Sequence, residues 1–173
     1  VVVDDGSTDD TAERVERWGD RVTCHRQANA GPAAARNRAI RHARGALLAF
    51  LDADDLWLPT KLSRQVTYFD KFPQTGLLHT AARVTSTPGE FALESQEPGN
   101  LIAQPPTHQY CSIFHLDHDV MTLTAMVPRA VLEEVGPFDE RRELHVEDWD
   151  LWLRIAARHP VGYLPLPLAI HRP

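Results

Sequence analysis

The first residues of the chain combine a short apolar run with a segment of helical periodicity. Val1–Val3 is a continuous apolar run that ends in an Asp-Asp-Gly-Ser sequence, a pattern typical of a buried strand followed by a turn. We expect a helix next, capped by Ser7 or Thr8 and running to about Trp18, because apolar residues recur three positions apart along it. This region therefore predicts a strand that leads through a tight turn into a helix.

The following segments continue this alternation. Val22–His25 is a short candidate strand, and Pro32 suits the first turn of a helix that reaches Ala43. Ala46–Leu51 is six apolar residues in succession, the pattern of a strand covered on both faces. Strands that alternate with helices predict an α/β fold with a mainly parallel sheet flanked by helices.

The pattern is less regular further along. After Pro59 a helix is predicted to about Lys71, with the apolar residues Leu62, Val66 and Phe69 on one stripe. Further strands are predicted at 76–84 and 121–127, and further helices at 128–135 and 146–158.

Residues 85–119 show little periodicity and carry several Pro and Gly residues, so we expect a long irregular segment there. Loops of that length inside compact domains are usually lids or binding loops. No change in composition marks a domain boundary, and 173 residues fit one hydrophobic core. We therefore expect a single domain over residues 1–173.

The balance of charged residues excludes one class of partner. The formal net charge is -6 at pH 7, whereas nucleic-acid binders usually carry a basic surplus. No nucleic-acid partner is therefore expected. A free nucleotide remains compatible with this charge, because a metal ion can bridge acidic side chains to phosphates.

Cysteine content and the start of the sequence bear on location. Cys24 and Cys111 have no metal-type spacing and suggest no disulfide framework, so a cytoplasmic setting is the default. No run approaches the roughly 20 apolar residues of a membrane span. The chain starts inside an apolar run and without Met, so we expect a piece of a longer protein. Its missing flanks could carry peripheral contacts with the inner face of the membrane.

Acidic residues follow two of the predicted strands. Asp4 and Asp5 come after the first strand, and Asp52 and Asp54 come after the apolar run that ends at Leu51. The carboxyl ends of strands in open α/β sheets form the ligand-binding edge, so both pairs are expected there. The second pair can supply oxygen ligands for Mg2+ or Mn2+. A solvated acidic turn explains the second pair equally well, and an Asp-Gly turn with a helix cap explains the first.

Two further residues have both a chemical and a structural interpretation. Arg36 lies about one turn into an alanine-rich helix, where it could reach a diphosphate, although a surface arginine is at least as common. Asp148 lies near the start of a predicted helix, where a carboxylate could take a proton from an acceptor hydroxyl. An acidic residue at that position also stabilises the helix dipole and needs no other role.

A group of histidine and aspartate residues lies within the irregular segment. Zinc ligation is conceivable, but the spacing matches no strong metal signature. Loop histidines that touch substrate, or nothing, explain the group better. Its members are His108, His115, Asp117, His118 and Asp119.

The order of the motifs resembles a known family. VVVDDGSTDDT at 1–11 is followed by NAGPAAARN at 29–37 and AFLDADDLWLPTKL at 49–62. VGPFDE at 135–140 then precedes EDWDLWLR at 147–154. Together they resemble the inverting glycosyltransferase family 2 from the first residue to Arg172. The resemblance implies the GT-A fold and an enzyme that moves a sugar from a nucleotide-sugar donor to an acceptor.

The resemblance also implies residue roles on the donor side. Asp5 matches the carboxylate that contacts the base of the donor nucleotide, with Asp4 beside it. Arg36 matches the helix arginine near that nucleotide. Asp54 matches the metal-ligating residue of the DxD motif, and Asp52 matches its partner near ribose and metal. Mn2+ or Mg2+ is the implied cofactor.

On the acceptor side, Asp148 of the Glu-Asp pair matches the catalytic base. The implied mechanism is one in-line displacement with inversion at the anomeric carbon, most often from a UDP-sugar. The acceptor is a carbohydrate, a lipid-linked molecule or a protein. Residues 1–84 would then form the donor half and residues 85–173 the acceptor half.

Two alternatives stay open from the residues. Asp-rich strand ends with a cation also serve nucleotidyl or phosphoryl transfer on a similar fold. The chain could also bind nucleotide without turnover, because family members usually carry a strand and a helix before the Asp-Asp-Gly-Ser turn. In the family that strand lies between the first strand here and the one at Leu47–Leu51. We therefore expect a gap between Val1–Val3 and Leu47–Leu51, or another segment in that place, and direct pairing of the two would contradict this topology.

Overall fold

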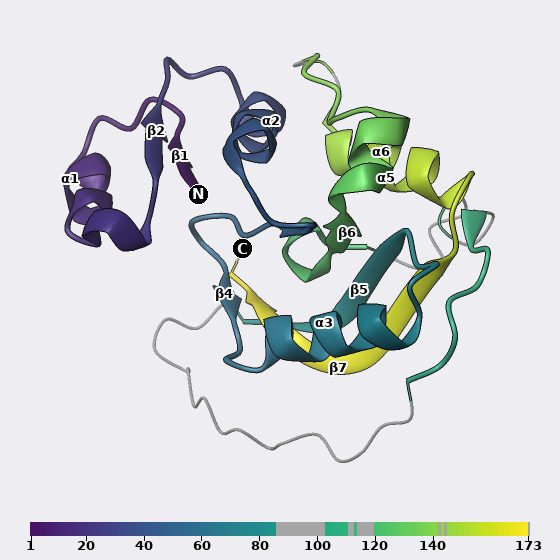
Figure 1. Ribbon diagram of the computed structural model, residues 1–173. Coiled ribbons are helices and arrows are strands. Elements are labelled where there is room, and N and C mark those ends of the chain that lie inside the picture. Colours follow the sequence, from purple (N-terminus) through teal and green to yellow (C-terminus); the bar gives the residue numbers. More distant parts are fainter. Residues whose placement is uncertain (86–102, 111–112, 114–119, 142, 144, 173) are drawn as a thin grey trace.

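The computed structural model describes residues 1–85, 103–110, 113, 120–141, 143 and 145–172 (Figure 1). No helix within these ranges is both long and apolar enough to cross a membrane. The elements in chain order are β1 (Val2–Asp4), α1 (Thr11–Glu16), η1 (Gly19–Arg21), β2 (Cys24–Arg26), α2 (Pro32–His42), β3 (Leu47–Ala49), β4 (Leu56–Trp57), α3 (Lys61–Lys71), β5 (Leu77–Val84), η2 (Thr122–Thr124), β6 (Met126–Pro128), α5 (Arg129–Val135), α6 (Glu147–Ala156) and β7 (Val161–His171).

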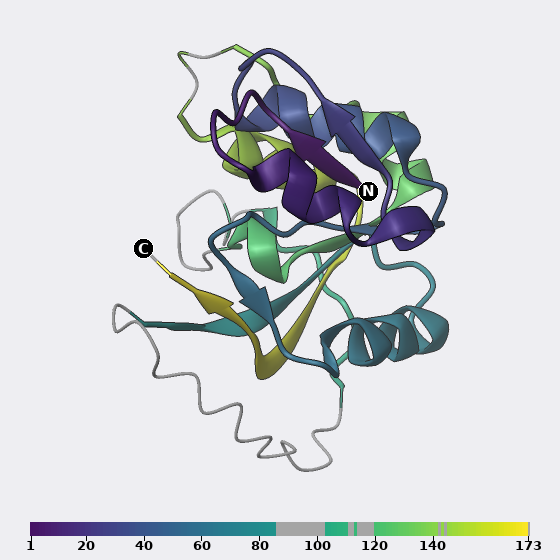
Figure 2. The same cartoon turned by 90° about the vertical axis from the view of Figure 1, so that its left-hand side faces the viewer.

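The strands form two sheets. β1 pairs with β2 in parallel, and a five-stranded sheet has the order β3-β6-β5-β7-β4. Within the larger sheet β5 pairs with β7 in parallel, whereas β3 with β6, β6 with β5 and β7 with β4 are antiparallel. The α/β class is confirmed, and the larger sheet is mixed because β6 runs opposite to both of its neighbours. Figure 2 shows the small sheet with α1 beside it, above the larger sheet.

Several predicted helices have the expected bounds. α2 begins at Pro32 after Gly31, whose φ of +94° favours glycine, and α3 ends at Lys71. α5 stops at Gly136, also at positive φ. The first helix was placed too early, because Ser7 donates its backbone N–H to Asp4 and so belongs to the turn. α1 therefore starts at Thr11.

The apolar stripe of α3 is buried only at Phe69, which is 7% exposed. Leu62 and Val66 are 44% and 40% exposed, whereas Lys61 and Gln65 are fully buried. The Lys61 amine donates to Gln65 Oε1 at 2.7 Å and lies 4.4 Å from the ring centre of Trp57. Gln65 Nε2 in turn donates to a backbone carbonyl of η2 at 2.9 Å. Because the buried polar groups have partners, their burial is tolerated.

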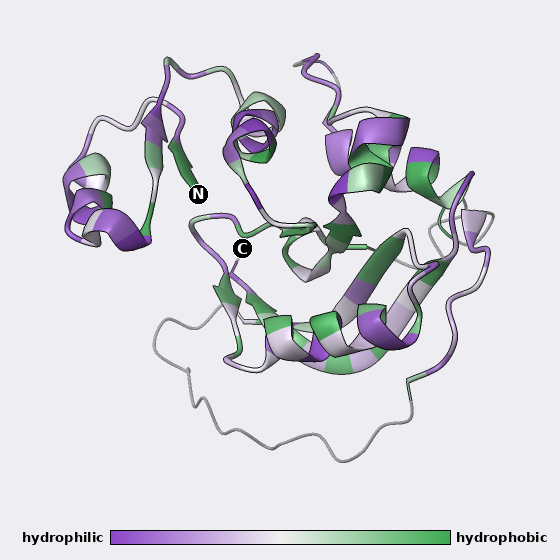
Figure 3. Cartoon of the chain, viewed as in Figure 1, coloured by the Kyte–Doolittle hydropathy of each residue, from purple (hydrophilic) through white to green (hydrophobic). Residues whose placement is uncertain are grey.

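The main core lies between α5, α6 and the larger sheet. Apolar residues are concentrated on β5 and β6 in Figure 3. Phe50, Phe138 and Trp152 form its aromatic centre, with ring centres 5.3 to 6.4 Å apart. Such tilted and edge-on pairs are a favoured aromatic geometry. This packing joins the segment after β3 to the middle of α6.

The expected gap between the first and third strands is present. β1 pairs with β2 and β3 pairs with β6, and β1 and β3 do not pair with each other. A groove of about 420 Å³ lies between them, lined by Val1–Val3 on one side and Ala49–Ala53 on the other. Val1 is 51% exposed and Leu51 45% exposed. The run at 46–51 is therefore not covered on both faces as its sequence predicts.

The burial of Lys61 on α3 can be tested through its pKa. Burial lowers the pKa of Lys61 from 10.5 to about 7. Between these two values the unfolded chain binds more protons than the folded one, so the contribution of Lys61 to the free energy of unfolding rises with pH. The free-energy cost of burying the Lys61 amine is complete below about pH 7. It disappears above the pKa that Lys61 has in the unfolded chain.

We expect the parent protein to gain stability relative to Lys61→Met between about pH 7 and about pH 9, by up to about 1.4 kcal/mol per pH unit. Thermal unfolding at several pH values measures how the free energy of unfolding changes with pH. Because only this slope is compared, the pH-independent effect of removing the Lys61 partner of Gln65 does not enter the result. Lys71→Met, at an exposed position of the same helix, is the control and should keep the parent's slope. If the free energy of unfolding changes with pH equally in Lys61→Met and in the parent, the lowered pKa assigned to Lys61 is wrong.

Candidate active site

The turn after β1 is held by two carboxylates. Asp4 is 3% exposed, accepts the Ser7 N–H at 2.8 Å and pairs with Arg26 Nε at 3.1 Å. The hydrogen bonds from Ser7, and then the charge of Arg26, hold the pKa of Asp4 below its usual value. Asp4 is therefore a fixed anion inside the turn, with its carboxylate directed at protein groups.

Asp5 connects this turn to the start of α2. Its Oδ1 accepts Gln27 Nε2 at 2.7 Å and the Ala30 N–H at 2.9 Å, and its Oδ2 accepts the Gly31 N–H at 2.8 Å. The loop before α2 is thus fixed on the carboxyl end of β1.

Arg36 lies between two carboxylates from distant parts of the chain. Its Nη2 donates to Asp52 Oδ2 at 2.7 Å, and its Nη1 donates to Glu147 Oε1 at 2.8 Å. The Arg36 side chain is 14% exposed. Burial alone would lower the pKa of Arg36, but the two carboxylates outweigh it and raise that pKa. A cation with these partners stays charged and links α2, the loop after β3 and the start of α6.

The DxD segment divides into an inward and an outward part. Asp55 is 6% exposed and accepts His171 Nδ1 at 2.9 Å and the Arg172 N–H at 3.2 Å, which ties the loop to the end of β7. Asp54 is exposed and offers its backbone carbonyl to Arg172 Nε. The Asp52 side chain is 42% exposed. The two predicted metal ligands are therefore accessible, and their neighbour anchors the loop.

These carboxylates fit one mode of cation binding. Among the described residues no three His, Cys, Asp or Glu side chains form a cluster that could hold a metal ion by itself. Mg2+ is commonly bound through one or two carboxylates together with substrate phosphates, rather than in a cage of protein ligands. Asp52 and Asp54 match that mode. In the group around His108, all members except His108 itself lie outside the described residues.

Asp148 lies in the first turn of α6 but faces another part of the molecule than Glu147. Its Oδ2 accepts the Thr122 hydroxyl at 2.8 Å, and its Oδ1 accepts the N–H of Trp149 at 2.8 Å. Glu147 turns to Arg36 instead. The two neighbouring acidic residues thus connect α6 to the donor side and to η2.

Two hollows lie on either side of the Arg36–Glu147 pair. Arg36 and Asp52 line the groove between β1 and β3. Glu147 lines a second hollow of about 410 Å³, together with the loop Asn29–Ala33 and the segment around Glu140. Because one partner of the ion pair lines each hollow, the pair lies at their junction. This junction is where the donor-side and acceptor-side motifs meet.

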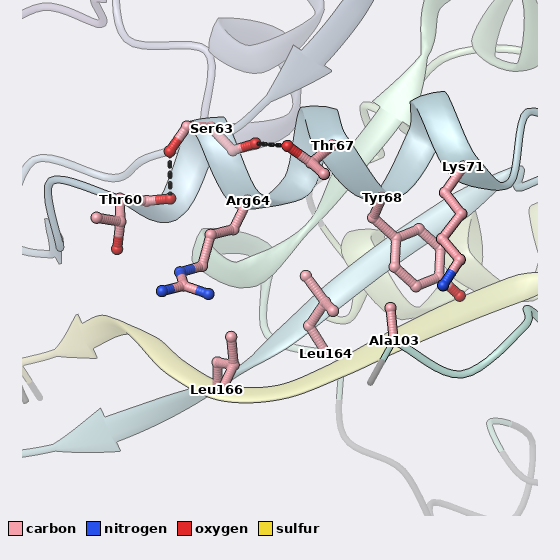
Figure 4. A pocket seen from close by; sticks show the side chains of 9 residues that line it. All are labelled: Thr60, Ser63, Arg64, Thr67, Tyr68, Lys71, Ala103, Leu164 and Leu166. Carbon is pink, nitrogen blue, oxygen red and sulfur yellow. Dashed lines mark hydrogen bonds between the residues drawn. The ribbon is translucent and has the colours of Figure 1, made fainter. Parts of the chain in front are cut away.

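A third hollow lies away from these motifs. It has a volume of about 350 Å³ and runs along α3, between the helix and β7 (Figure 4). Arg64 and Lys71 border it over an apolar floor that includes Leu164 and Leu166. None of the candidate site residues lines it.

Comparison with known proteins identifies this arrangement. The family described as Glycosyl transferase family 2 matches residues 1–136. The chain belongs to glycosyl transferase family 2. The glucosyltransferase WfaP of Escherichia coli is 40% identical over 162 residues, which are 91% of this chain and 58% of WfaP. An uncharacterized glycosyltransferase of Rickettsia typhi is 26% identical over 89% of this chain, which spans 48% of that relative.

Solved structures share the fold. The S. aureus TarS 1-349 structure in complex with UDP-GlcNAc has a TM-score of 0.75 and 20% identity, over 99% of this chain and 48% of that one. The mannosyltransferase PcManGT of Pyrobaculum calidifontis, in complex with GDP-Man and Mn2+, has a TM-score of 0.68 and 21% identity, over 98% and 46%. The GT-A fold implied by the motifs is thereby confirmed.

Other family 2 motif residues hold the site together. Asn37 is 2% exposed; its Nδ2 donates to the Phe138 carbonyl at 2.9 Å and to Glu140 Oε1 at 2.8 Å. Its Oδ1 accepts the Phe138 N–H at 3.0 Å. The Asn37 amide thus fixes the loop of the Gly-Pro-Phe-Asp-Glu motif against α2. Asn37 directly follows Arg36 in this helix.

Sequence reasoning missed Glu147, Thr122 and Asn37. Glu147 carried a signal, because it stands directly before Asp148 in an acidic pair at a helix start. Asn37 ends the NAGPAAARN motif, but nothing in the sequence indicates its partner 101 residues away, and Thr122 carried no signal, since its partner lies 26 residues away. The structure brings Arg36 and Asp52 together as predicted residues of one site.

The role of Asn37 can be tested by stability. Asn37→Leu should lower the free energy of unfolding by about 2 to 5 kcal/mol, because each buried polar group left unsatisfied costs about 1 to 3 kcal/mol. Urea unfolding provides the measurement. Arg41→Leu changes an exposed position one turn further along α2 and is the control. A loss for Asn37→Leu no larger than that of the control would show that the loop does not depend on this amide.

Proposed function

We propose that this chain forms the catalytic core of an inverting, metal-assisted glycosyltransferase that moves a sugar from a nucleoside-diphosphate sugar to an acceptor hydroxyl. The observation that carries the proposal is the buried bridge of Arg36 between Asp52 and Glu147. It sets the carboxylates that follow β3 beside the acidic pair that opens α6. Family 2 membership and the GT-A fold support the same reaction class.

The donor is proposed to be a UDP-sugar held by the first half of the chain, residues 1–84. TarS was solved with UDP and with UDP-GlcNAc, and the name of WfaP gives UDP-Glc as its donor. Asp5, supported by Asp4, would contact the nucleotide base, and Asp52 the ribose. Arg36 would face the diphosphate, because it lines the groove in which Asp52 also lies.

Asp54 and Asp52 would hold the cation. PcManGT was solved with Mn2+ beside its GDP-sugar, and the two accessible carboxylates here fit Mn2+ or Mg2+. When bound, the ion would neutralise charge on the departing diphosphate. The protein's own part is to present both carboxylates at the end of β3, which the Asp55 contact with His171 secures.

The acceptor side is proposed to lie in residues 85–173, with Asp148 as the base. Its carboxylate would take the proton of the acceptor hydroxyl as that oxygen attacks the anomeric carbon from the face opposite the diphosphate. WfaP's name gives an acceptor, GlcNAc-diphosphoundecaprenol, that is lipid-linked. A similar acceptor would bring this protein to the inner face of the membrane, and a carbohydrate or protein acceptor fits the same chemistry.

Product analysis tests the reaction class. With UDP-glucose, Mn2+ and a synthetic GlcNAc-diphosphate-lipid, we expect release of UDP and a product one hexose larger with inverted configuration. Release of pyrophosphate would indicate nucleotidyl transfer instead. Binding of UDP without any product from a panel of UDP-sugars and acceptors would indicate a nucleotide-binding module.

Asp54→Ala tests the cation site. We expect the enhancement of UDP binding by Mn2+ to fall by at least about 10- to 100-fold, the loss typical even of groups that only orient metal ligands. Calorimetric titration with UDP, with and without Mn2+, measures it. Asp70→Ala removes an exposed carboxylate from α3 and is the control. If Asp54→Ala binds UDP and Mn2+ as the parent does, the metal assignment is wrong.

Asp148→Asn tests the base. Transfer should fall by about 100- to 10,000-fold, the usual contribution of a general base, while UDP affinity with Mn2+ stays near that of the parent. Initial rates at saturating donor, paired with the same titration, separate the two effects. A rate within a few-fold of the parent would leave Asp148 only a structural role at the start of α6.

A further inference from the structure

Thr122 makes a contact that no motif indicates. It lies in η2, is 6% exposed, and its hydroxyl donates to Asp148 Oδ2 at 2.8 Å. Hydrogen bonds from neutral donors to a carboxylate are shorter and stronger than those between neutral groups. The proposed base is therefore bound to a buried hydroxyl on a different element.

The position of that hydroxyl is fixed by its surroundings. Trp57 Nε1 donates to the Leu123 carbonyl at 2.8 Å, and Gln65 Nε2 donates to the Thr124 carbonyl at 2.9 Å. Thr124 closes the turn by donating its hydroxyl to the Met121 carbonyl at 2.7 Å. Two elements that follow the DxD loop, β4 and α3, thus clamp the backbone of η2.

The hydrogen bonds that the described residues make to the Asp148 carboxylate orient it and do not occupy all of its acceptor positions. Oδ2 accepts from Thr122 and Oδ1 from the N–H of Trp149. The indole of Trp149 donates to the Ile113 carbonyl at 3.0 Å, which fixes the start of α6. Since a carboxylate has about four acceptor positions, the contacts made by the described residues leave each oxygen one position for a hydroxyl proton.

We propose that Thr122 is a positioning residue for Asp148, holding the carboxylate in the orientation that receives the proton of the acceptor hydroxyl. This inference rests on the proposed function. Proton transfer requires the base to lie within hydrogen-bond reach of the proton, and small errors in orientation cost rate. Loss of the Thr122 hydroxyl would free the Asp148 side chain to rotate while the metal and the donor contacts stay in place.

Thr122→Val keeps the shape of the side chain and removes its donor. With UDP-glucose, Mn2+ and the GlcNAc-diphosphate-lipid as probes, we expect kcat of the full chain to fall about 10- to 100-fold, the worth of a hydrogen bond to a charged group. The KM for UDP-glucose and the calorimetric affinity for UDP should not change. Thr122→Ser restores a hydroxyl and should recover most of the rate.

Thr75→Val is the matched control, because it removes a buried hydroxyl that donates to the Phe72 carbonyl at 2.7 Å, outside η2 and away from Asp148. Its kcat should stay within about twofold of the parent even if its melting temperature falls. Should Thr122→Val not fold, Thr122→Ala makes the same comparison with Thr122→Ser.

Three results would overturn the inference. Thr122→Val could match the parent in kcat while Asp148→Asn is inactive. That result would exclude the positioning role of Thr122 and leave the proposed function standing. Thr122→Ser could be as slow as Thr122→Val, which would assign the loss to packing rather than to the hydroxyl. Asp148→Asn could transfer at the parental rate, which would remove the base assignment and the role of Thr122 with it.

Discussion

The arrangement of the site depends on one buried cation. Asp52 and Glu147 lie 95 positions apart in the sequence, on the loop after β3 and at the start of α6, and Arg36 holds both at 2.7 to 2.8 Å. The Arg36 side chain is 14% exposed and that of Asp52 is 42% exposed, so the bridge lies partly in solvent on the Asp52 side. The small sheet joins this arrangement through Asp5, which fixes the loop that leads into α2. The donor-side and acceptor-side motifs are therefore placed relative to each other by charge as well as by the apolar core.

The same bridge constrains how a ligand enters. A cation bound to Asp52 competes with Arg36 for the same carboxylate oxygens, and a diphosphate competes with Asp52 for Arg36. Glu147 keeps its own hydrogen bond to Arg36 in either case, so the guanidinium stays charged and in place. Exchange of one ionic partner for another costs less than creating an unpaired charge, because each buried charge remains compensated. In the proposed reaction Arg36 would therefore turn from a protein carboxylate to the donor phosphates without moving α2.

Sequence reasoning predicted the elements with strong local signals and missed what depends on distant partners. Pro32 and Gly136 mark helix ends by backbone preference alone, so α2 and α5 were placed well. On α3 the stripe predicted from apolar residues is buried at Phe69 and exposed at Leu62, and a distant partner, the Thr124 carbonyl, makes the burial of Gln65 acceptable. The sequence alone does not show that the two neighbouring carboxylates at 147–148 have different contacts. Their roles diverge because one faces Arg36 and the other Thr122.

Arginines near and within the motifs have structural roles. Arg129 donates to the Ala43 carbonyl at 2.6 Å at the end of α2, and Arg154 donates to the Val135 carbonyl at 2.8 Å at the end of α5. Both cap a helix with a charge of the favourable sign. Their presence is explained by the fold, as is that of Asn37. Asp54 is different, because its carboxylate is exposed at the ligand edge and no described contact of the fold uses it. In the proposed function, this is the carboxylate that would meet a cation entering from solvent.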